Sequence, residues 1–254
     1  MQHFIQPSSI VREIWGRADV ILVIFGGAAA EFALNKAVDW LYYTGRLPAD
    51  PLGRLFSTVQ YAHHIIFAEP AQSIAAITRM RAIHTGVETA RGSNIPDWAY
   101  RDVLFMLIHY SIAAYELLER KLTIAEKEEV VKVFLTVGEH MQLQGLPGNY
   151  TGWQAQYAMQ QQQNLAYSNY TADLFKQYRK HLGAFRYALL LQTQQLIISD
   201  TVRSYLPAPT LHWLKAILPV YKCGNRLHIS RTIRNLLLPA AYKQQIIALD
   251  RHPA

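Results

Sequence analysis

Apolar residues recur along most of the chain at intervals of three and four positions, the spacing that gives a helix one buried face. Proline and glycine interrupt this pattern at several points. No long segment alternates apolar and polar residues in the way that a half-exposed strand does. The sequence therefore predicts an all-α protein with little strand.

The interruptions of the pattern place the expected helices. Thr123 and Glu126 have the spacing of a capping box, which predicts a helix that starts there and ends near residue 144. A first helix is expected at 8–25 and is broken at Gly26–Gly27, after which a second helix runs to about residue 43. Further helices are expected at 51–68, at 70–89, at 97–120 and in two stretches between 150 and 206, followed by a smaller basic helical region at 210–250. We expect one domain over 1–206, with 207–254 as a basic C-terminal extension packed on it.

His84 lies near the centre of the most apolar face of the helix expected at 70–89. Arg81 and Glu88 flank it on one edge of that face. Burial of either charge without a partner is costly, so something must compensate. One interpretation is an Arg81–Glu88 ion pair beside a hydrogen-bonded core histidine. The other is a cofactor site, in which a neutral imidazole binds a metal and a guanidinium pairs with acid groups of the cofactor.

The preceding helix carries a second polar face within an apolar context. Arg54, Thr58, Tyr61 and Ile65 share one side of it, which is typical either of the polar wall of a pocket or of a solvated stripe. His109 lies in the middle of the expected helix 97–120, which is apolar on nearly every side. It is interpreted either as a core histidine with a hydrogen-bond partner or as a residue that supports a pocket.

Net charge is +7 and is unevenly distributed. Residues 1–175 hold 13 Lys and Arg against 16 Asp and Glu, a net of −3, whereas 176–254 hold 12 against 2, a net of +10. The basic residues are scattered without a dense run, so a solvated surface is favoured, a peripheral membrane contact stays open, and no nucleic-acid partner is expected.

Several classes of site are excluded by what the sequence lacks. Cys223 is the single cysteine, which rules out an internal disulfide and a zinc site of several thiolates, and it favours a reducing compartment. No Gly-rich phosphate loop, His-Glu-x-x-His or G-x-S-x-G motif is present. The start of the chain lacks the pattern of a signal peptide, and the apolar stretch at 20–30 is too short to span a membrane. A cytoplasmic location is therefore expected.

Five stretches, in this order, give the chain a recognisable signature: REIWGRADVILVIFGGAAA, DPLGRLFSTVQY, RMRAIHTGV, IHYSIAAYELLERKLTIAEKEEV and VGEHMQLQGLP. With them the chain resembles the haem-dependent oxygenase family of MpaB and latex-clearing protein, the rubber oxygenase. The resemblance implies an all-α domain of about eight or more helices around a buried cofactor pocket. It also implies a haem b cofactor, dioxygen or peroxide as oxidant, and a small hydrophobic substrate, which in this family is often attacked at a carbon–carbon double bond.

The same resemblance assigns roles to individual residues. It makes His84 the proximal iron ligand, supported by Arg81 as a cofactor-binding residue. It places Arg54 and Thr58 on the oxidant side as catalytic residues, with Glu31 as an approximate match to an acidic catalytic group. His109 is a looser match on the helix that closes the pocket, and Tyr61 is a third cofactor-binding candidate.

Two hypotheses compete with an oxygenase. Ser57 stands where the rubber oxygenases carry a lysine, and Glu88 stands where they carry an arginine. These differences leave open a non-catalytic helical protein that binds haem or a lipid-like ligand. A basic helical adaptor that uses 176–254 on nucleic acid or a membrane is the other alternative, and its binding is expected to weaken steeply with salt.

Overall fold

The structure is a computed structural model, and it describes residues 4–45, 49–207 and 213–226. These ranges hold eleven α-helices and no strand, with one isolated β-bridge between Asn35 and Leu165. The all-α prediction is confirmed. The helices are α1 (Ile10–Trp15), α2 (Ala18–Leu34), α3 (Val38–Tyr43), α5 (Pro51–Phe67), α6 (Pro70–Arg91), α7 (Asp97–Leu118), α8 (Ile124–His140), α9 (Tyr150–Asn164), α10 (Asn169–Ile197), α11 (Asp200–Tyr205) and α12 (Trp213–Arg226).

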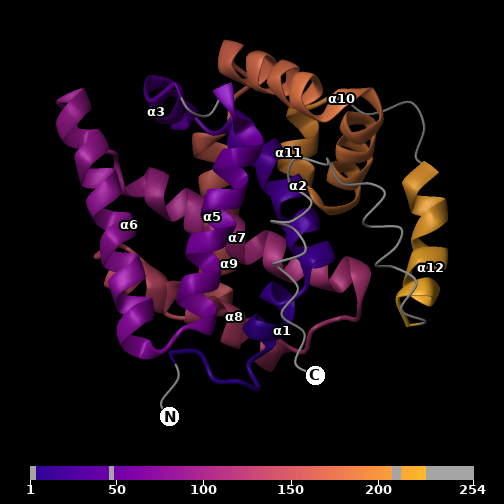
Figure 1. Cartoon of the computed structure of the whole chain (residues 1–254), viewed down its shortest axis with the longest axis horizontal. Helices are drawn as coiled ribbons and strands as arrows, with labels where there is room; N and C mark the ends of the chain where they lie inside the picture. Colours follow the sequence, from indigo (N-terminus) through magenta and orange to yellow (C-terminus); the bar gives the residue numbers. More distant parts are fainter. Residues whose placement is uncertain (1–3, 46–48, 208–212, 227–254) are drawn as a thin grey trace.

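The core forms around α2 and α7, which pack against each other along most of their lengths. Side chains that are large, apolar and fully buried fill the space between them and their neighbours, among them Trp15, Ile24, Phe105, Ile108 and Tyr110. Figure 1 shows the result as a single body, with α6 at one edge and α12 at the opposite edge. The chain is one helical domain over the residues that the structure describes.

The predicted break at Gly26–Gly27 is wrong, because α2 runs through both glycines without interruption. The helical pattern breaks earlier instead, at Gly16, which follows α1, and later, at Asn35, which follows α2. Glycine normally weakens a helix interior. Here the absent side chain lets α2 approach Tyr110 of α7 and Ile197 of α10 closely, and that packing outweighs the lower helix propensity.

Most other predicted bounds agree with the structure to within a few residues. The capping box at Thr123 is present in full, since its hydroxyl accepts from the backbone N–H of Glu126 and the Glu126 carboxylate accepts from the backbone N–H of Thr123. Pro51 and Pro70 lie in the first turns of α5 and α6. The basic region expected at 210–250 lies outside the described residues except for α12.

α5 and α6 form a helical hairpin on one side of the core, and α10 covers the other side. α10 changes direction at Gly183, whose φ of +73° is a left-handed conformation that residues with a Cβ rarely adopt. α12 packs against α10. Among the described residues, no helix is both long enough and apolar enough to cross a bilayer.

Candidate functional site

A cavity of about 820 Å³ lies between the α5–α6 hairpin, α2, α7 and α10, and it extends to α12. This volume falls within the range of cofactor and ligand sites, roughly 300–1,000 Å³. Its lining is almost entirely apolar, with charged side chains limited to Asp19, Arg54 and Arg186 among the described residues. Such a cavity suits a large, mostly hydrophobic ligand that meets a few polar groups.

The face of α5 predicted to be polar contributes one wall of this cavity. Arg54, Thr58, Tyr61 and Ile65 all line it, so the face forms part of a pocket and not a solvated stripe. The Thr58 hydroxyl donates to the carbonyl oxygen of Arg54 at 3.1 Å, one turn earlier on the same helix. This bond fixes the side-chain rotamer and leaves the oxygen's lone pairs available to accept a hydrogen bond.

His84 faces α5 from the inner side of α6 and also lines the cavity. Its ring meets Tyr100 edge to face, with the ring centroids 5.2 Å apart. Its Nδ1 is buried without a hydrogen-bond partner. Burial lowers the pKa of His84, and the nearby positive charge of Arg54 lowers it further. The imidazole is therefore neutral at pH 7, with a lone pair available to a metal.

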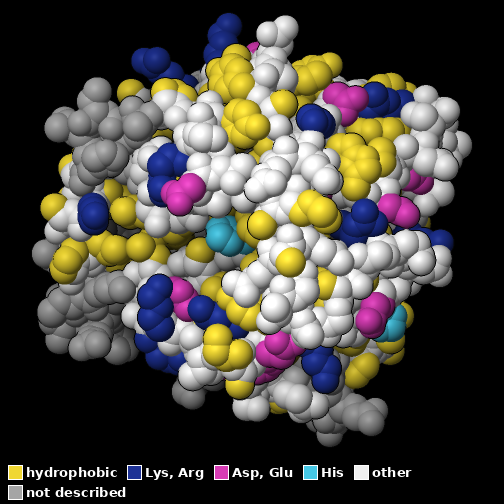
Figure 2. Space-filling view, turned by 180° about the vertical axis from the view of Figure 1, so that it is seen from behind, with side chains coloured by type: hydrophobic (Ala, Val, Ile, Leu, Met, Phe, Trp, Pro, Cys, Tyr) yellow, Lys and Arg dark blue, Asp and Glu magenta, His cyan; other side chains and the backbone are white. Residues whose placement is uncertain are grey.

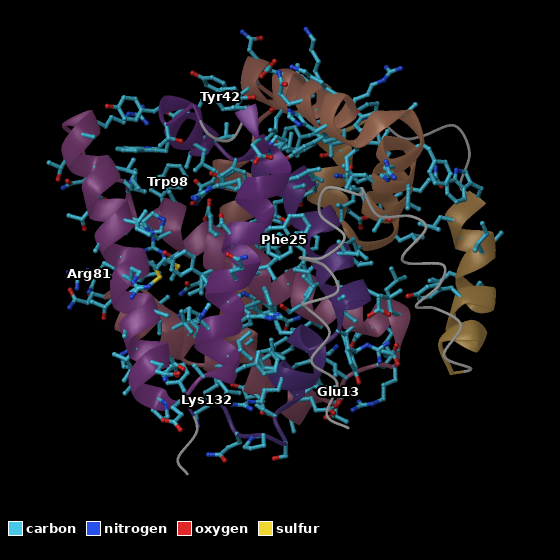
Figure 3. The ribbon with its side chains drawn as sticks, viewed as in Figure 1. Glu13, Phe25, Tyr42, Arg81, Trp98 and Lys132 are labelled. Carbon is cyan, nitrogen blue, oxygen red and sulfur yellow. The ribbon has the colours of Figure 1, made fainter. Side chains whose placement is uncertain are left out.

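The Arg81–Glu88 ion pair, the alternative explanation for this face, does not form. Arg81 is exposed and is absent from the described lining of the cavity. Figure 3 shows its side chain at the outer edge of α6, directed away from the other helices. The Glu88 carboxylate instead accepts from the backbone N–H of Ile95 at 2.9 Å and from the hydroxyl of Tyr100 at 3.2 Å. Glu88 thus holds the ring that packs on His84.

Glu31 lies outside the cavity lining, on the opposite side of α2. One of its carboxylate oxygens accepts hydrogen bonds from the hydroxyls of Tyr110 (2.9 Å) and Tyr157 (2.7 Å) and from the side-chain amide of Gln161 (3.0 Å). Burial nonetheless dominates and raises the pKa of Glu31 to about 7. Asp102 lies near it and accepts from the side-chain amides of Asn35 and Asn164.

His109 belongs to this second group of residues and not to the cavity. Its ring packs against Tyr110 and Tyr157, with centroid distances of 4.8 and 5.0 Å, and these are the tyrosines that hold Glu31. Burial lowers the pKa of His109 to about 4, and its Nε2 has no hydrogen-bond partner. The predicted site residues therefore divide into a cavity group (Arg54, Thr58, Tyr61, His84), a polar core group (Glu31, His109) and the exposed Arg81.

Sequence reasoning missed the residues that complete both groups. Tyr100 lines the cavity beside His84, and Tyr110, Tyr157 and Asp102 surround Glu31. A hint was available for Asp102, which stands seven residues before His109 on one line of the helix. Nothing in the spacing could have indicated Tyr157, because it lies 126 positions from the carboxylate that it contacts.

Comparison with protein families gives one match that covers most of the chain. The family described as "ER-bound oxygenase mpaB/B'/Rubber oxygenase, catalytic domain" matches residues 13–241. This span includes both groups of site residues and α12. Comparison with curated proteins and with solved structures gives no match.

Proposed function

The chain belongs to the mpaB/rubber oxygenase catalytic-domain family of oxygenases, and from this membership we propose that it is a haem b-dependent oxygenase with His84 as the iron ligand. Its substrate is a small hydrophobic compound with a carbon–carbon double bond. The observation that carries the proposal is the unpartnered, neutral imidazole of His84 at the wall of a large apolar cavity.

The residues of the cavity fit a haem. A porphyrin needs an apolar enclosure of several hundred Å³, one axial donor and cations for its two carboxylates. The 820 Å³ cavity provides the enclosure, and a ring nitrogen of His84 provides the donor. Arg54 and Arg186 are the guanidinium groups that line the cavity in the described part of the chain, so they, and not Arg81, would pair with the carboxylates.

The protein's own residues have separable roles in this proposal. His84 would hold the iron, while Tyr100, fixed by Glu88, would set the orientation of the imidazole ring. Haem iron would supply the electron chemistry that activates dioxygen or peroxide. Thr58 would position the oxidant by accepting a hydrogen bond from it, as a peroxide allows, because its hydroxyl lines the cavity from α5, across from α6, and its proton is donated to the Arg54 carbonyl. The apolar lining would exclude water and hold the substrate.

The polar core group has no contact with the cofactor in this proposal. Glu31 and His109 lie behind α2 and α7, where the described lining of the large cavity does not reach. We assign them to the packing of α2, α7 and α9, because Glu31 accepts hydrogen bonds from the last two of these helices.

A substitution that removes a hydroxyl and keeps the shape tests the proposed activity. Haem-loaded protein is incubated aerobically, or with peroxide, with a medium-chain alkene, and carbonyl products are measured by mass spectrometry. We expect turnover by the parent protein and a loss of about tenfold or more in Thr58→Val, in line with the removal of one positioned hydrogen-bonding group.

Thr78→Val is the matched control for this substitution. Thr78 also donates to the carbonyl four residues earlier, at 3.0 Å, but it is exposed and lies on α6 away from the cavity. Turnover should be unchanged in this variant. Haem binding without oxidation of any alkene by the parent protein would contradict the oxygenase proposal and support a non-catalytic haem carrier instead.

A further inference from the structure

Three large apolar side chains at the α10–α12 end of the cavity are both exposed to solvent and part of its lining. Phe185 is 64% exposed, Ile217 48% and Trp213 36%. Phe185 follows the bend of α10 at Gly183, and the other two lie one turn apart on α12. A side chain that meets both solvent and the cavity marks an opening, so these three residues form the rim of a mouth.

The inner side of α12 is already occupied. Leu218 and Tyr221 pack against the main core, and the Tyr221 hydroxyl donates to the Asp19 carboxylate of α2 at 3.0 Å. The helix is therefore held on the protein through Leu218 and Tyr221, while Trp213 and Ile217 lie between the cavity and solvent. Core packing does not account for apolar residues in those positions.

Exposed basic side chains lie on the same two helices as this rim. Lys176, Arg179 and Lys180 are exposed on the first half of α10, and Lys215 is exposed on α12. Between residues 176 and 226 the one acidic residue is Asp200, which pairs with Arg203 at 2.6 Å. In Figure 2, hydrophobic side chains gather along the left edge, the side on which α12 lies, with Lys and Arg side chains near them.

We propose that this rim, formed by Phe185, Trp213 and Ile217, docks on an anionic lipid bilayer together with the exposed lysines of α10 and α12, and opens the cavity toward the bilayer. Tryptophan and phenylalanine beside lysine are typical of the membrane interface, where rings enter the headgroup region and cations meet lipid phosphates and carboxylates. A nucleic acid does not explain the apolar residues, and a protein partner does not explain why they continue into a ligand cavity.

The proposed docking depends only on the rim, whereas the role of docking in substrate delivery depends on the proposed function. A small apolar substrate concentrates in the bilayer, so a mouth held at its surface lets the substrate enter without crossing water. His84 lies on α6, at the edge of the molecule opposite α12 (Figure 1), so the substrate would traverse the cavity from the rim to the iron site.

Vesicle co-sedimentation of the full chain tests the docking. Vesicles of phosphatidylcholine are compared with vesicles that also contain phosphatidylserine, at low and high salt. We expect binding to the anionic vesicles that weakens with salt. The double variant Phe185→Ser/Ile217→Ser should bind about tenfold more weakly or worse, and Lys215→Glu should weaken binding by about fivefold or more.

Two control variants distinguish binding through the rim from nonspecific hydrophobic adsorption and from nonspecific charge attraction to the vesicles. Ile124→Ser removes an apolar side chain that is 68% exposed on α8, outside the cavity lining. Lys132→Glu reverses a charge on α8, and Figure 3 shows Lys132 far from α12. Both variants should bind vesicles as the parent does. The proposal would be overturned if the control variants weakened vesicle binding as much as the rim variant does, or if the parent chain did not bind vesicles. It would also be overturned if the parent chain failed to bind vesicles but formed concentration-dependent dimers that the rim variant does not form.

The His84→Ala variant keeps this test independent of the oxygenase proposal. It should sediment with anionic vesicles as the parent does, because the rim lies at the other end of the cavity. Vesicle binding together with absent alkene oxidation would retain the docking surface and reject the proposed function. Alkene oxidation without vesicle binding would retain the proposed function and reject the docking surface.

Discussion

Gly27 of α2 lies against the ring of Tyr110 of α7 so closely that a Cβ at position 27 would overlap the ring and stand 2.6 Å from Cδ1 of Ile197. Both neighbours are buried, and Tyr110 is further fixed by its bond to Glu31. A methyl group therefore has no space without separation of the two central helices. Gly27→Ala should lower the free energy of unfolding by about 1–3 kcal/mol or more, measured by urea denaturation.

Gly86→Ala is the matched change on an exposed helix. A Cβ there meets no atom within 4 Å, so alanine's higher helix propensity should leave the free energy of unfolding unchanged or raise it by up to about 1 kcal/mol. If Gly27→Ala were as stable as Gly86→Ala, the close packing of α2 on α7 would be refuted.

The buried carboxyl of Glu31 should give the protein a pH-dependent stability. Its pKa is raised from 4.5 to about 7 by burial, so folding favours the protonated form. The stabilisation is fully present below about pH 4.5 and is lost as the pH rises through 7. Glu31→Gln should remove this loss, which amounts to about 3 kcal/mol at most. The free energy of unfolding of the variant, relative to that of the parent protein, should therefore be higher at pH 8 than at pH 5.

Thermal unfolding of both proteins across that pH range measures the effect. The difference between them isolates position 31 from the other groups that titrate there. Glu69→Gln, which changes an exposed carboxylate before α6, should retain the pH dependence of the parent protein. A constant difference between parent and Glu31→Gln from pH 5 to pH 8 would show that Glu31 is not protonated on folding.

Filling the large cavity should remove ligand binding without loss of the fold. Ala62 lines the cavity from α5, one residue after Tyr61. In Ala62→Phe the added ring enters space that is open in the structure, so the melting temperature should stay within a few degrees of the parent value or rise. Titration with haem, followed by absorbance, should show binding weakened about tenfold or more.

Ala75→Phe serves as the reference for this change. Ala75 is exposed on α6 and does not line the described cavity, so this variant should bind haem as the parent does. Unchanged haem binding in Ala62→Phe, in a correctly folded protein, would mean that haem does not occupy this cavity.

Local patterns predicted the helices well, because their signals lie within a few residues of one another. The capping pair Thr123 and Glu126, and prolines in the first turns of α5 and α6, define helix starts directly. The continuation of α2 through Gly26 and Gly27 could not be predicted from local sequence. Whether glycine ends a helix or allows a close approach depends on Tyr110, more than 80 positions further along the chain.

The cavity face of α5 and the inward position of His84 also follow from helical spacing. Spacing could not decide the place of Arg81, because a residue at the edge of a face turns inward or outward according to the neighbouring helix. It likewise could not separate Glu31 and His109 from the cavity. That separation depends on α9 supplying Tyr157, a contact between distant segments.

The absorbance spectrum of purified protein reconstituted with haem tests the central claim most directly. The parent chain should show a Soret band of a histidine-ligated haem, and His84→Ala should lose it. The exposed His64 on α5, which bonds to the carbonyl of Gln60, is the control, and His64→Ala should keep the band. An identical Soret band and haem affinity in His84→Ala would contradict the account.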